Sequence, residues 1–213
     1  MPKTTLIDNL IAGGYLRTPQ IIDAFRKIKR RDFVLPENKD QAEVDAPLSI
    51  GYGQTISQPA TVAFMLEKLQ PRAGEKILDI GSGSGWTAAL LASLVAPSGK
   101  VYGLERIGEL VEFARGNLAK YDFLEKGIVK IFCTDGYNGL PEFGLFDKIL
   151  VSAAAEEIPE ELLEQLKIGG RLVMPLGRRF ETQSIIVVDK TSEGKFKQKE
   201  FPGFIFVPLI KDS

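Results

Sequence analysis

The chain has 213 residues, of which 44% are hydrophobic and 26% are charged. That length supports one full hydrophobic core and is short for two independent ones, so we expect a single domain. The 27 basic and 28 acidic residues nearly cancel, which argues against nucleic acid or a charged membrane surface as a partner. Because the sequence contains no histidine, Ser-His-Asp and Cys-His systems, histidine general bases and histidine-ligated zinc are excluded, and no metal is expected.

Signals for export or membrane insertion are not apparent. No apolar run reaches the roughly 18 residues of a membrane span, and the N-terminus lacks the apolar core of a signal peptide. We therefore expect a cytoplasmic protein, and the near-neutral charge leaves a monomer as the expectation. The single cysteine, Cys133, lies in the apolar run IVKIFC and is predicted to be buried in a strand. A basic cluster at 27–31 follows an amphipathic helical pattern and is interpreted as a solvated helix end.

The first third of the chain predicts helices around a loop. Apolar residues recur at helical spacing over 6–11 and over 21–28, which indicates two short helices. Residues 32–57 contain two prolines, two glycines and no sustained period, which predicts a long ordered loop rather than a helix or sheet element. Loops of this length are often functional. From Pro59 the apolar spacing predicts a helix that ends before Gly74.

Strands and helices alternate after that helix. Strands are predicted near 76–80, 100–105, 128–134, 147–152 and 170–175, and helices near 85–95, 107–121 and 159–167. Two further strand-like runs, within 183–190 and 197–209, follow without a helix and predict an antiparallel hairpin. The expected fold is α/β, with a doubly wound, Rossmann-like, mostly parallel sheet. Within one domain we expect N-terminal helices with an active-site loop (1–58), a cofactor-binding core (59–180) and the C-terminal hairpin (181–213).

The segment DIGSGSGW (79–86) joins the first of these strands to an apolar helix. Its glycines, Gly81, Gly83 and Gly85, indicate a turn where a ligand approaches the backbone closely. The spacing differs from the dinucleotide fingerprint, which would need glycine at the position of Trp86, and the lysine of a phosphate-binding loop is missing. The indole of Trp86 is either a wall of the ligand pocket or part of the buried helix packing.

Three acids fall at or just past the carboxyl ends of the first three predicted strands: Asp79, Glu105 and Asp135. Ligands of doubly wound sheets bind beyond these ends, so we expect the carboxylates to meet at one edge. S-adenosylmethionine, with its ribose diol, ammonium and sulfonium, fits such a site. Glu105 would accept hydrogen bonds from both ribose hydroxyls, Asp79 would face the cationic end, and Asp135 with Gly136 would border the adenine. Taken singly, each acid could equally cap a helix or turn.

Over nearly its whole length the chain resembles the protein-L-isoaspartate O-methyltransferase family. The resemblance lies in segments that follow the family's order: APLSIGYGQTISQPATVAFMLEKL, ILDIGSGSGWTAALLA, GLERIGELVEFARGNL, TDGYNG, AAAEEIPEELLEQLKIGGRLVMPLG and the closing FVPL. The glycine motif alone indicates only a methyltransferase, and GQTISQP is much more specific. Trp86 stands where the family frequently has tyrosine, and Asp79 where it has glutamate.

The resemblance implies a repair enzyme that transfers a methyl group from S-adenosylmethionine to the free α-carboxylate of L-isoaspartyl residues in damaged proteins and peptides, with S-adenosylhomocysteine as the product. It implies a catalytic role for Ser57, with Thr55 beside it. The positions expected to bind substrate are Ile56, Val207, Pro208 and Leu209. The positions expected to bind the cofactor are Asp79, Gly81, Ser82, Gly83, Gly85, Glu105, Arg106, Asp135 and Gly136.

Several of these positions keep a structural interpretation beside the functional one. Ser57 precedes Gln58, Pro59 and a helical pattern, which is typical of a helix N-cap, and both roles can coexist. Asp45 is either a turn residue or a contact to the substrate's backbone. The closing segment 206–209 is either the apolar end of a strand or a surface that pairs with a peptide main chain. Two other functions stay open, a small-molecule methyltransferase and a non-catalytic adenosyl-binding module, although intact GQTIS and FVPL segments favour repair.

Overall fold

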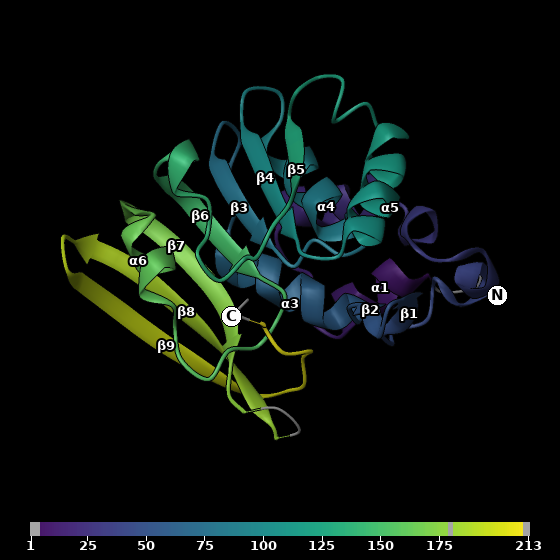
Figure 1. The fold of residues 1–213 in the computed structure, drawn as a ribbon. Helices are drawn as coiled ribbons and strands as arrows, with labels where there is room; N and C mark the ends of the chain where they lie inside the picture. The colour runs from purple at the N-terminus through teal and green to yellow at the C-terminus, as the bar shows by residue number, and fades with distance from the viewer. Residues whose placement is uncertain (1–4, 179–180, 211–213) are drawn as a thin grey trace.

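The computed structural model describes residues 5–178 and 181–210, and its centre is one seven-stranded sheet (Figure 1). The strands are β3 (Lys76–Ile80), β4 (Lys100–Glu105), β5 (Val129–Cys133), β6 (Phe146–Val151), β7 (Leu166–Leu176), β8 (Gln183–Ser192) and β9 (Lys195–Phe204). They stand in the order β5-β4-β3-β6-β7-β8-β9, parallel from β5 to β7 and antiparallel from β7 to β9. The predicted α/β fold, with a mostly parallel sheet and a C-terminal antiparallel hairpin, is confirmed.

Apolar side chains cover both faces of the sheet. Along β3, Ile77 belongs to the larger buried cluster on one face, whereas Leu78 and Ile80 belong to the cluster on the other. Parallel strands that are buried on both faces are nearly continuous apolar runs in sequence, as KILDI is. The strand order reverses beside β3, because β4 and β6 pair with its two edges. Such a reversal is where doubly wound sheets bind ligands.

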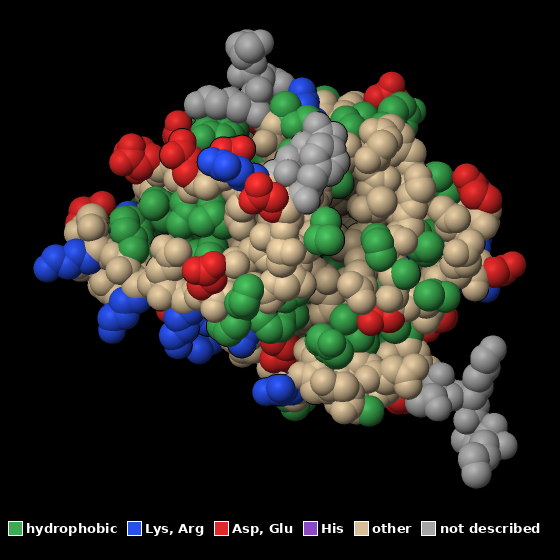
Figure 2. Space-filling model, turned by 90° about the horizontal axis from the view of Figure 1, so that it is seen from below, with side chains coloured by type: hydrophobic (Ala, Val, Ile, Leu, Met, Phe, Trp, Pro, Cys, Tyr) green, Lys and Arg blue, Asp and Glu red, His purple; other side chains and the backbone are tan. Residues whose placement is uncertain are grey.

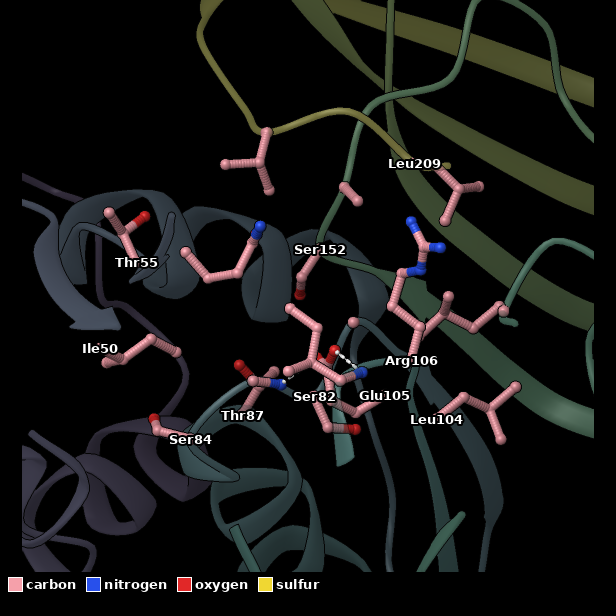
Figure 3. Close-up of a pocket in the computed structure, with 18 of the residues that line it drawn as sticks. Ile50, Thr55, Ser82, Ser84, Thr87, Leu104, Glu105, Arg106, Ser152 and Leu209 are labelled. Carbon is pink, nitrogen blue, oxygen red and sulfur yellow. Dashed lines mark hydrogen bonds between the residues drawn. The ribbon is translucent and has the colours of Figure 1, made fainter. Parts of the chain in front are cut away.

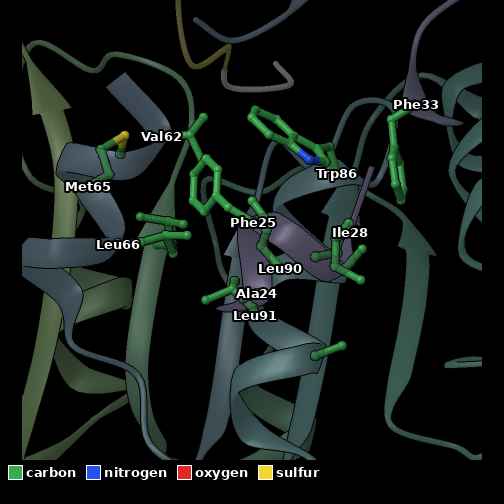
Figure 4. Packing of buried hydrophobic residues seen from close by; sticks show 14 of the residues in the cluster. Ala24, Phe25, Ile28, Phe33, Val62, Met65, Leu66, Trp86, Leu90 and Leu91 are labelled. Atoms are coloured by element: carbon green, nitrogen blue, oxygen red, sulfur yellow. The ribbon is translucent and has the colours of Figure 1, made fainter. Parts of the chain in front are cut away.

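Helices pack against these two clusters. One face carries α3 (Pro59–Leu69), α4 (Trp86–Val95) and α5 (Gly108–Ala119), and the other carries α6 (Glu160–Glu164) and the 3-10 turn η3 (Pro141–Phe143). The helix α4 is buried almost all round, because α2 (Pro19–Lys27) packs on its outer side, with α1 (Leu6–Ala12) against α2 (Figure 4). Within residues 5–178 and 181–210, no helix has the length and apolar character needed to cross a membrane.

The segment 32–57 contains more regular structure than the predicted loop. It includes the 3-10 turns η1 (Arg30–Phe33) and η2 (Pro36–Gln41), followed by two short antiparallel strands, β1 (Leu48–Gly51) and β2 (Gln54–Ile56). We call residues 48–56 the front hairpin. The alternation of buried and exposed residues along β1 covers only four positions, which is at the lower limit of a run that indicates a strand from sequence. Their connecting turn, Tyr52-Gly53, has positive φ at both positions, as a two-residue hairpin of this kind requires.

Three local predictions are wrong. The predicted helix to 167 ends at Glu164, because Leu166 already begins β7. The predicted last strand to 209 ends at Phe204, and the residues after it leave the sheet. Cys133 is exposed rather than buried, because it is the last residue of β5, beyond the point where the flanking elements cover the strand.

Candidate active site

The glycine loop, residues 81–85, connects β3 to α4. Gly81, Gly83 and Gly85 all have positive φ, at 78°, 52° and 86°, and residues other than glycine rarely adopt such backbone angles. A Cβ on Gly85 would lie 3.1 Å from the Cβ of Ala114 in α5, so this glycine allows α4 and α5 to pack closely. A Cβ on Gly83 would lie 3.3 Å from Cδ1 of Ile50, which places the front hairpin directly beside the loop.

Glu105 ends β4 and its carboxylate is fixed by two backbone groups. Its Oε2 accepts a hydrogen bond from the N–H of Gly83 at 3.0 Å, and its Oε1 accepts one from the N–H of Ile107, also at 3.0 Å. The residue is 7% exposed. Because an ionised carboxylate has about four acceptor positions, the oxygens keep capacity for donors on a ligand.

A cavity of about 310 Å³ lies beyond the carboxyl ends of β3, β4, β5 and β6. The residues proposed from the sequence that line it are Thr55, Ile56, Ser57, Gly81, Ser82, Gly83, Glu105, Arg106, Asp135, Gly136, Val207, Pro208 and Leu209. Figure 3 shows Glu105 and Ser82 at its base, Thr55 and Ile50 on one side, and Arg106 and Leu209 on the other. The cavity therefore joins segments from all three predicted parts of the chain.

Asp79 and Gly85 do not line this cavity. Asp79 is fully buried beneath the loop, and within the described residues neither of its carboxylate oxygens has a hydrogen-bond partner. Burial raises the pKa of Asp79 to about 7; the nearby hydroxyl of Ser82 opposes this rise, and the charge of Glu105 adds a smaller upward contribution. The sequence led us to expect Asp79 to face the cationic end of a ligand, but its side chain does not line the cavity.

The turn after β5 forms another wall. Asp135 accepts a hydrogen bond from the N–H of Tyr137 at 2.8 Å, and a Cβ on Gly136 would lie 2.3 Å from Cγ2 of Ile80, so only glycine fits there. The buried amide of Gln165 holds the end of this turn: its Oε1 accepts from the N–H of Leu140 at 2.7 Å, and its Nε2 donates to a carbonyl of the turn at 2.8 Å. Sequence reasoning missed Gln165, because nothing local marks a glutamine whose partners are backbone groups.

The capping role considered for Ser57 is wrong, because Asp45 caps α3 instead. The helix begins at Pro59, and the side chains of Ser57 and Gln58 make no capping hydrogen bond. The Oδ1 of Asp45 accepts a hydrogen bond from the N–H of Ala60 at 2.8 Å, which satisfies one of the free donors of the first helical turn. Asp45 is therefore structural, and the Ser57 hydroxyl is left available on the cavity wall.

Arg30 holds the segment that carries Ser57, although the sequence suggested a solvated side chain. It is 3% exposed. Its guanidinium donates to four carbonyl oxygens, those of Ala42 at 3.1 Å, Val44 at 3.2 Å, Ala46 at 2.8 Å and Ser57 at 3.2 Å. Burial lowers its pKa to about 10, opposed by nearby acids, so it stays charged at neutral pH. The pattern of basic residues could not reveal these partners, because they are backbone groups.

The C-terminal segment, residues 205–210, crosses back over the sheet to close the cavity. The N–H of Ala154, just after β6, donates to the carbonyl of Val207 at 2.8 Å, and the N–H of Leu209 donates to the carbonyl of Ala154 at 2.7 Å. The N–H of Phe206 donates to Oε1 of Gln183 at 2.7 Å. Backbone pairing thus holds Val207, Pro208 and Leu209 on the cavity wall.

Trp86 serves both of the roles considered for it. It is 2% exposed and packs edge-on against Phe25, with ring centroids 5.7 Å apart (Figure 4). It also lines the cavity at the start of α4.

A doubly wound sheet with a glycine loop after its first parallel strand, and a fixed carboxylate at the end of the second, is typical of Rossmann-like folds that bind a nucleoside, and the matching family and solved structures identify it as the class I S-adenosylmethionine-dependent methyltransferase fold. The chain belongs to the protein-L-isoaspartate(D-aspartate) O-methyltransferase family, whose model matches residues 1–213.

Curated relatives and solved structures agree with this assignment. The chain is 46% identical over 208 residues to the protein-L-isoaspartate O-methyltransferase of Methanopyrus kandleri, covering 98% of this chain and 91% of the relative. It is 47% identical over 204 residues to that of Thermococcus onnurineus, covering 96% and 91%. A crystal structure of a family member from Plasmodium falciparum in complex with S-adenosyl-L-homocysteine is 28% identical, with a TM-score of 0.88 and 97% of each chain covered.

Proposed function

We propose that this chain transfers a methyl group from S-adenosylmethionine to the free α-carboxylate of L-isoaspartyl residues in damaged proteins and peptides. The proposal rests mainly on one observation: a single cavity has Glu105 and the glycine loop on one wall, and the front hairpin and Ser57 on another. Whole-chain membership of the family supports the same activity. A site that holds donor and acceptor together is what a transfer between them requires.

The cofactor side of the cavity fits S-adenosylmethionine. Glu105 has acceptor capacity beyond its two backbone donors, which suits a ribose diol. The close approach of Gly136 to Ile80 leaves a flat wall without a side chain, which suits the adenine, and Gly81 to Gly83, with Ser82, would lie along the amino-acid end. When bound, the cofactor supplies a methyl group on a positively charged sulfur. Arg106 and Asp135 complete this side.

The acceptor side needs no general base. A free carboxylate has a pKa of about 4, so it is already ionised at neutral pH, which agrees with a chain that has no histidine. Within the described residues the hydroxyl of Ser57 has no hydrogen-bond partner, and it lies on the wall of the cavity. We assign it to donate a hydrogen bond to the acceptor carboxylate, with Thr55 and Ile56 beside it. Without a base, Ser57 is not a nucleophile.

The main contribution of the chain is to align the two reactants and exclude water. Fixing reacting groups in the right geometry is worth on the order of 7–11 kcal/mol. Val207, Pro208 and Leu209, held by backbone pairing with Ala154, would meet the peptide substrate. Contacts to a peptide main chain are indifferent to side chains, which suits an enzyme that accepts many damaged sequences.

The proposal also covers the oligomeric state, the partners and the division of the chain into three parts. One chain supplies the residues that line the cavity, so a monomer suffices, and no nucleic acid is required. The division into 1–58, 59–180 and 181–213 assigns the acceptor side to the first part, the donor side to the second and the closing segment to the third.

The proposal is tested with two peptides that are identical except for isoaspartate in one and aspartate in the other. Each is incubated with the protein and with S-adenosylmethionine labelled in its methyl group. Base-labile label should enter only the isoaspartyl peptide. If label enters neither peptide while S-adenosylhomocysteine still binds, the proposed activity is wrong, and a binding module or a small-molecule methyltransferase is left.

A further inference from the structure

The turn of the front hairpin holds an aromatic residue in a conformation that disfavours it. Gly51, Tyr52 and Gly53 have φ values of 89°, 55° and 70°. Glycine adopts these angles readily, but a bulky side chain in the left-handed region is strained. Asparagine followed by glycine is the preferred sequence for a two-residue turn of this type. Tyr52 therefore costs the hairpin stability that asparagine at the same position would not.

Packing within the protein does not compensate for this strain. Tyr52 is 59% exposed, which makes it one of the most exposed large hydrophobic residues described. Backbone strain that packing does not repay is concentrated at functional sites. Tyr52 is both exposed and part of the cavity lining, which indicates a role in contacting what enters.

The C-terminal segment adds apolar side chains to the same cavity. Ile210 lines the cavity and is 45% exposed, and Val207 lines it as well. Among the described residues that line the cavity, the charged ones, Glu105, Arg106 and Asp135, come from the ends of β4 and β5. The lining residues contributed by the front hairpin and the C-terminal segment are uncharged. On the face shown in Figure 2, hydrophobic side chains lie in several separate groups, and many of the Lys and Arg side chains lie toward one edge.

We propose that Tyr52 is a specificity residue, whose ring packs against the side chain of the residue that precedes the isoaspartate and favours a large apolar or aromatic residue there. This inference rests on the proposed function. In an isoaspartyl peptide, the preceding residue is joined through one amide nitrogen to the carbon that bears the free carboxylate. The following residue is joined through an additional methylene and carbonyl. With the carboxylate at Ser57, the preceding side chain is therefore the nearer of the two to the reacting group, and we expect it to reach the front hairpin, which carries Tyr52.

The test compares kcat/KM for two peptides, Phe-isoAsp-Gly and Ala-isoAsp-Gly in the same context. The wild-type protein should prefer the phenylalanine peptide, and Tyr52→Asn should reduce this preference roughly tenfold, the order of effect expected for a lost apolar contact. Because Tyr52→Asn keeps the turn and removes the strain, its Tm should not fall. Tyr52→Phe should keep the preference. Leu145→Ala, at an exposed leucine that does not line the cavity, is the matched control and should also keep it.

A preference that Tyr52→Asn leaves unchanged, or that Leu145→Ala reduces equally, would overturn the assignment. Equal kcat/KM for both peptides with the wild-type protein would overturn it as well, while leaving the proposed function intact. If the wild-type protein methylates neither peptide, the proposed function itself is wrong.

Discussion

The guanidinium of Arg30 lies 5.5 Å from the centroid of the Trp86 ring. Arg30 therefore contacts the start of α4, directly after the glycine loop, while its hydrogen bonds hold the backbone of the segment that ends at Ser57. One buried cation thus connects the two walls of the cavity. Its charge and fork of donors suit this role, because the planar guanidinium spreads its donors over separate nitrogens, whereas the three donors of a lysine ammonium all start from one nitrogen.

Arg30→Met should lower the free energy of unfolding by about 3 kcal/mol, because four buried carbonyls lose a charged donor. Arg30→Lys restores the charge without the fork and should lower kcat more than it weakens S-adenosylhomocysteine binding. Urea denaturation and calorimetry measure these effects. A lysine variant with wild-type kcat would show that Arg30 does not position the Ser57 segment.

Asp45→Ala should lower stability, whereas Ser57→Ala should lower turnover. Asp45→Ala removes the cap of α3 and should cost about 1 kcal/mol of stability. Ser57→Ala should change stability by less than about 0.5 kcal/mol, lower kcat and leave the Kd for S-adenosylhomocysteine nearly unchanged. Thermal unfolding, calorimetry and turnover of an isoaspartyl peptide together separate the two. Equal losses of cofactor affinity and of turnover in Ser57→Ala would refute its assignment to the acceptor.

Glu105→Gln should weaken S-adenosylhomocysteine binding roughly 10- to 100-fold, because a hydrogen bond to a charged acceptor is lost and the new amide faces backbone N–H donors. The 2′-deoxy analogue of the ligand provides the control. If Glu105 binds the ribose hydroxyls, the variant should lose much less affinity for this analogue. The same loss for both ligands would place the ribose elsewhere.

Asp79 should make stability depend on pH. Burial raises its pKa in the folded state to about 7, well above the ordinary value of an aspartate side chain, about 3.8, so the folded state binds more protons than the unfolded one between these values. Stability due to this group therefore falls as the pH rises from about 4 to about 7. The free energy of unfolding of Asp79→Asn minus that of the wild type should be roughly 2 kcal/mol larger at pH 8 than at pH 5. An identical difference at both pH values would contradict this.

The sheet and the glycine loop could be predicted because their signals are local. A buried parallel strand such as KILDI is an apolar run, and the positive φ angles of Gly81, Gly83 and Gly85 require glycine. A family resemblance then indicated the roles of the front loop and of Ser57, which no local pattern supplies.

The supporting residues could not be predicted, because their partners lie far away in sequence or in the backbone. Arg30 and Gln165 bind carbonyls and amides, and Asp45 caps a helix that starts 14 residues later, at Pro59. Ser57, just before the helix, was expected to be the cap, but the tertiary structure brings Asp45 to that position instead. The exposure of Cys133 reflects where the strand ends, which is the least predictable property of any element.

A structure of the protein with S-adenosylhomocysteine and an isoaspartyl peptide tests the central claim most directly, since both ligands must share one cavity. We expect the ribose hydroxyls on Glu105 and the free carboxylate within hydrogen-bond distance of the Ser57 hydroxyl, with an oxygen of that carboxylate pointing at the sulfur. A peptide carboxylate bound away from Ser57, or a ribose turned away from Glu105, would contradict the account.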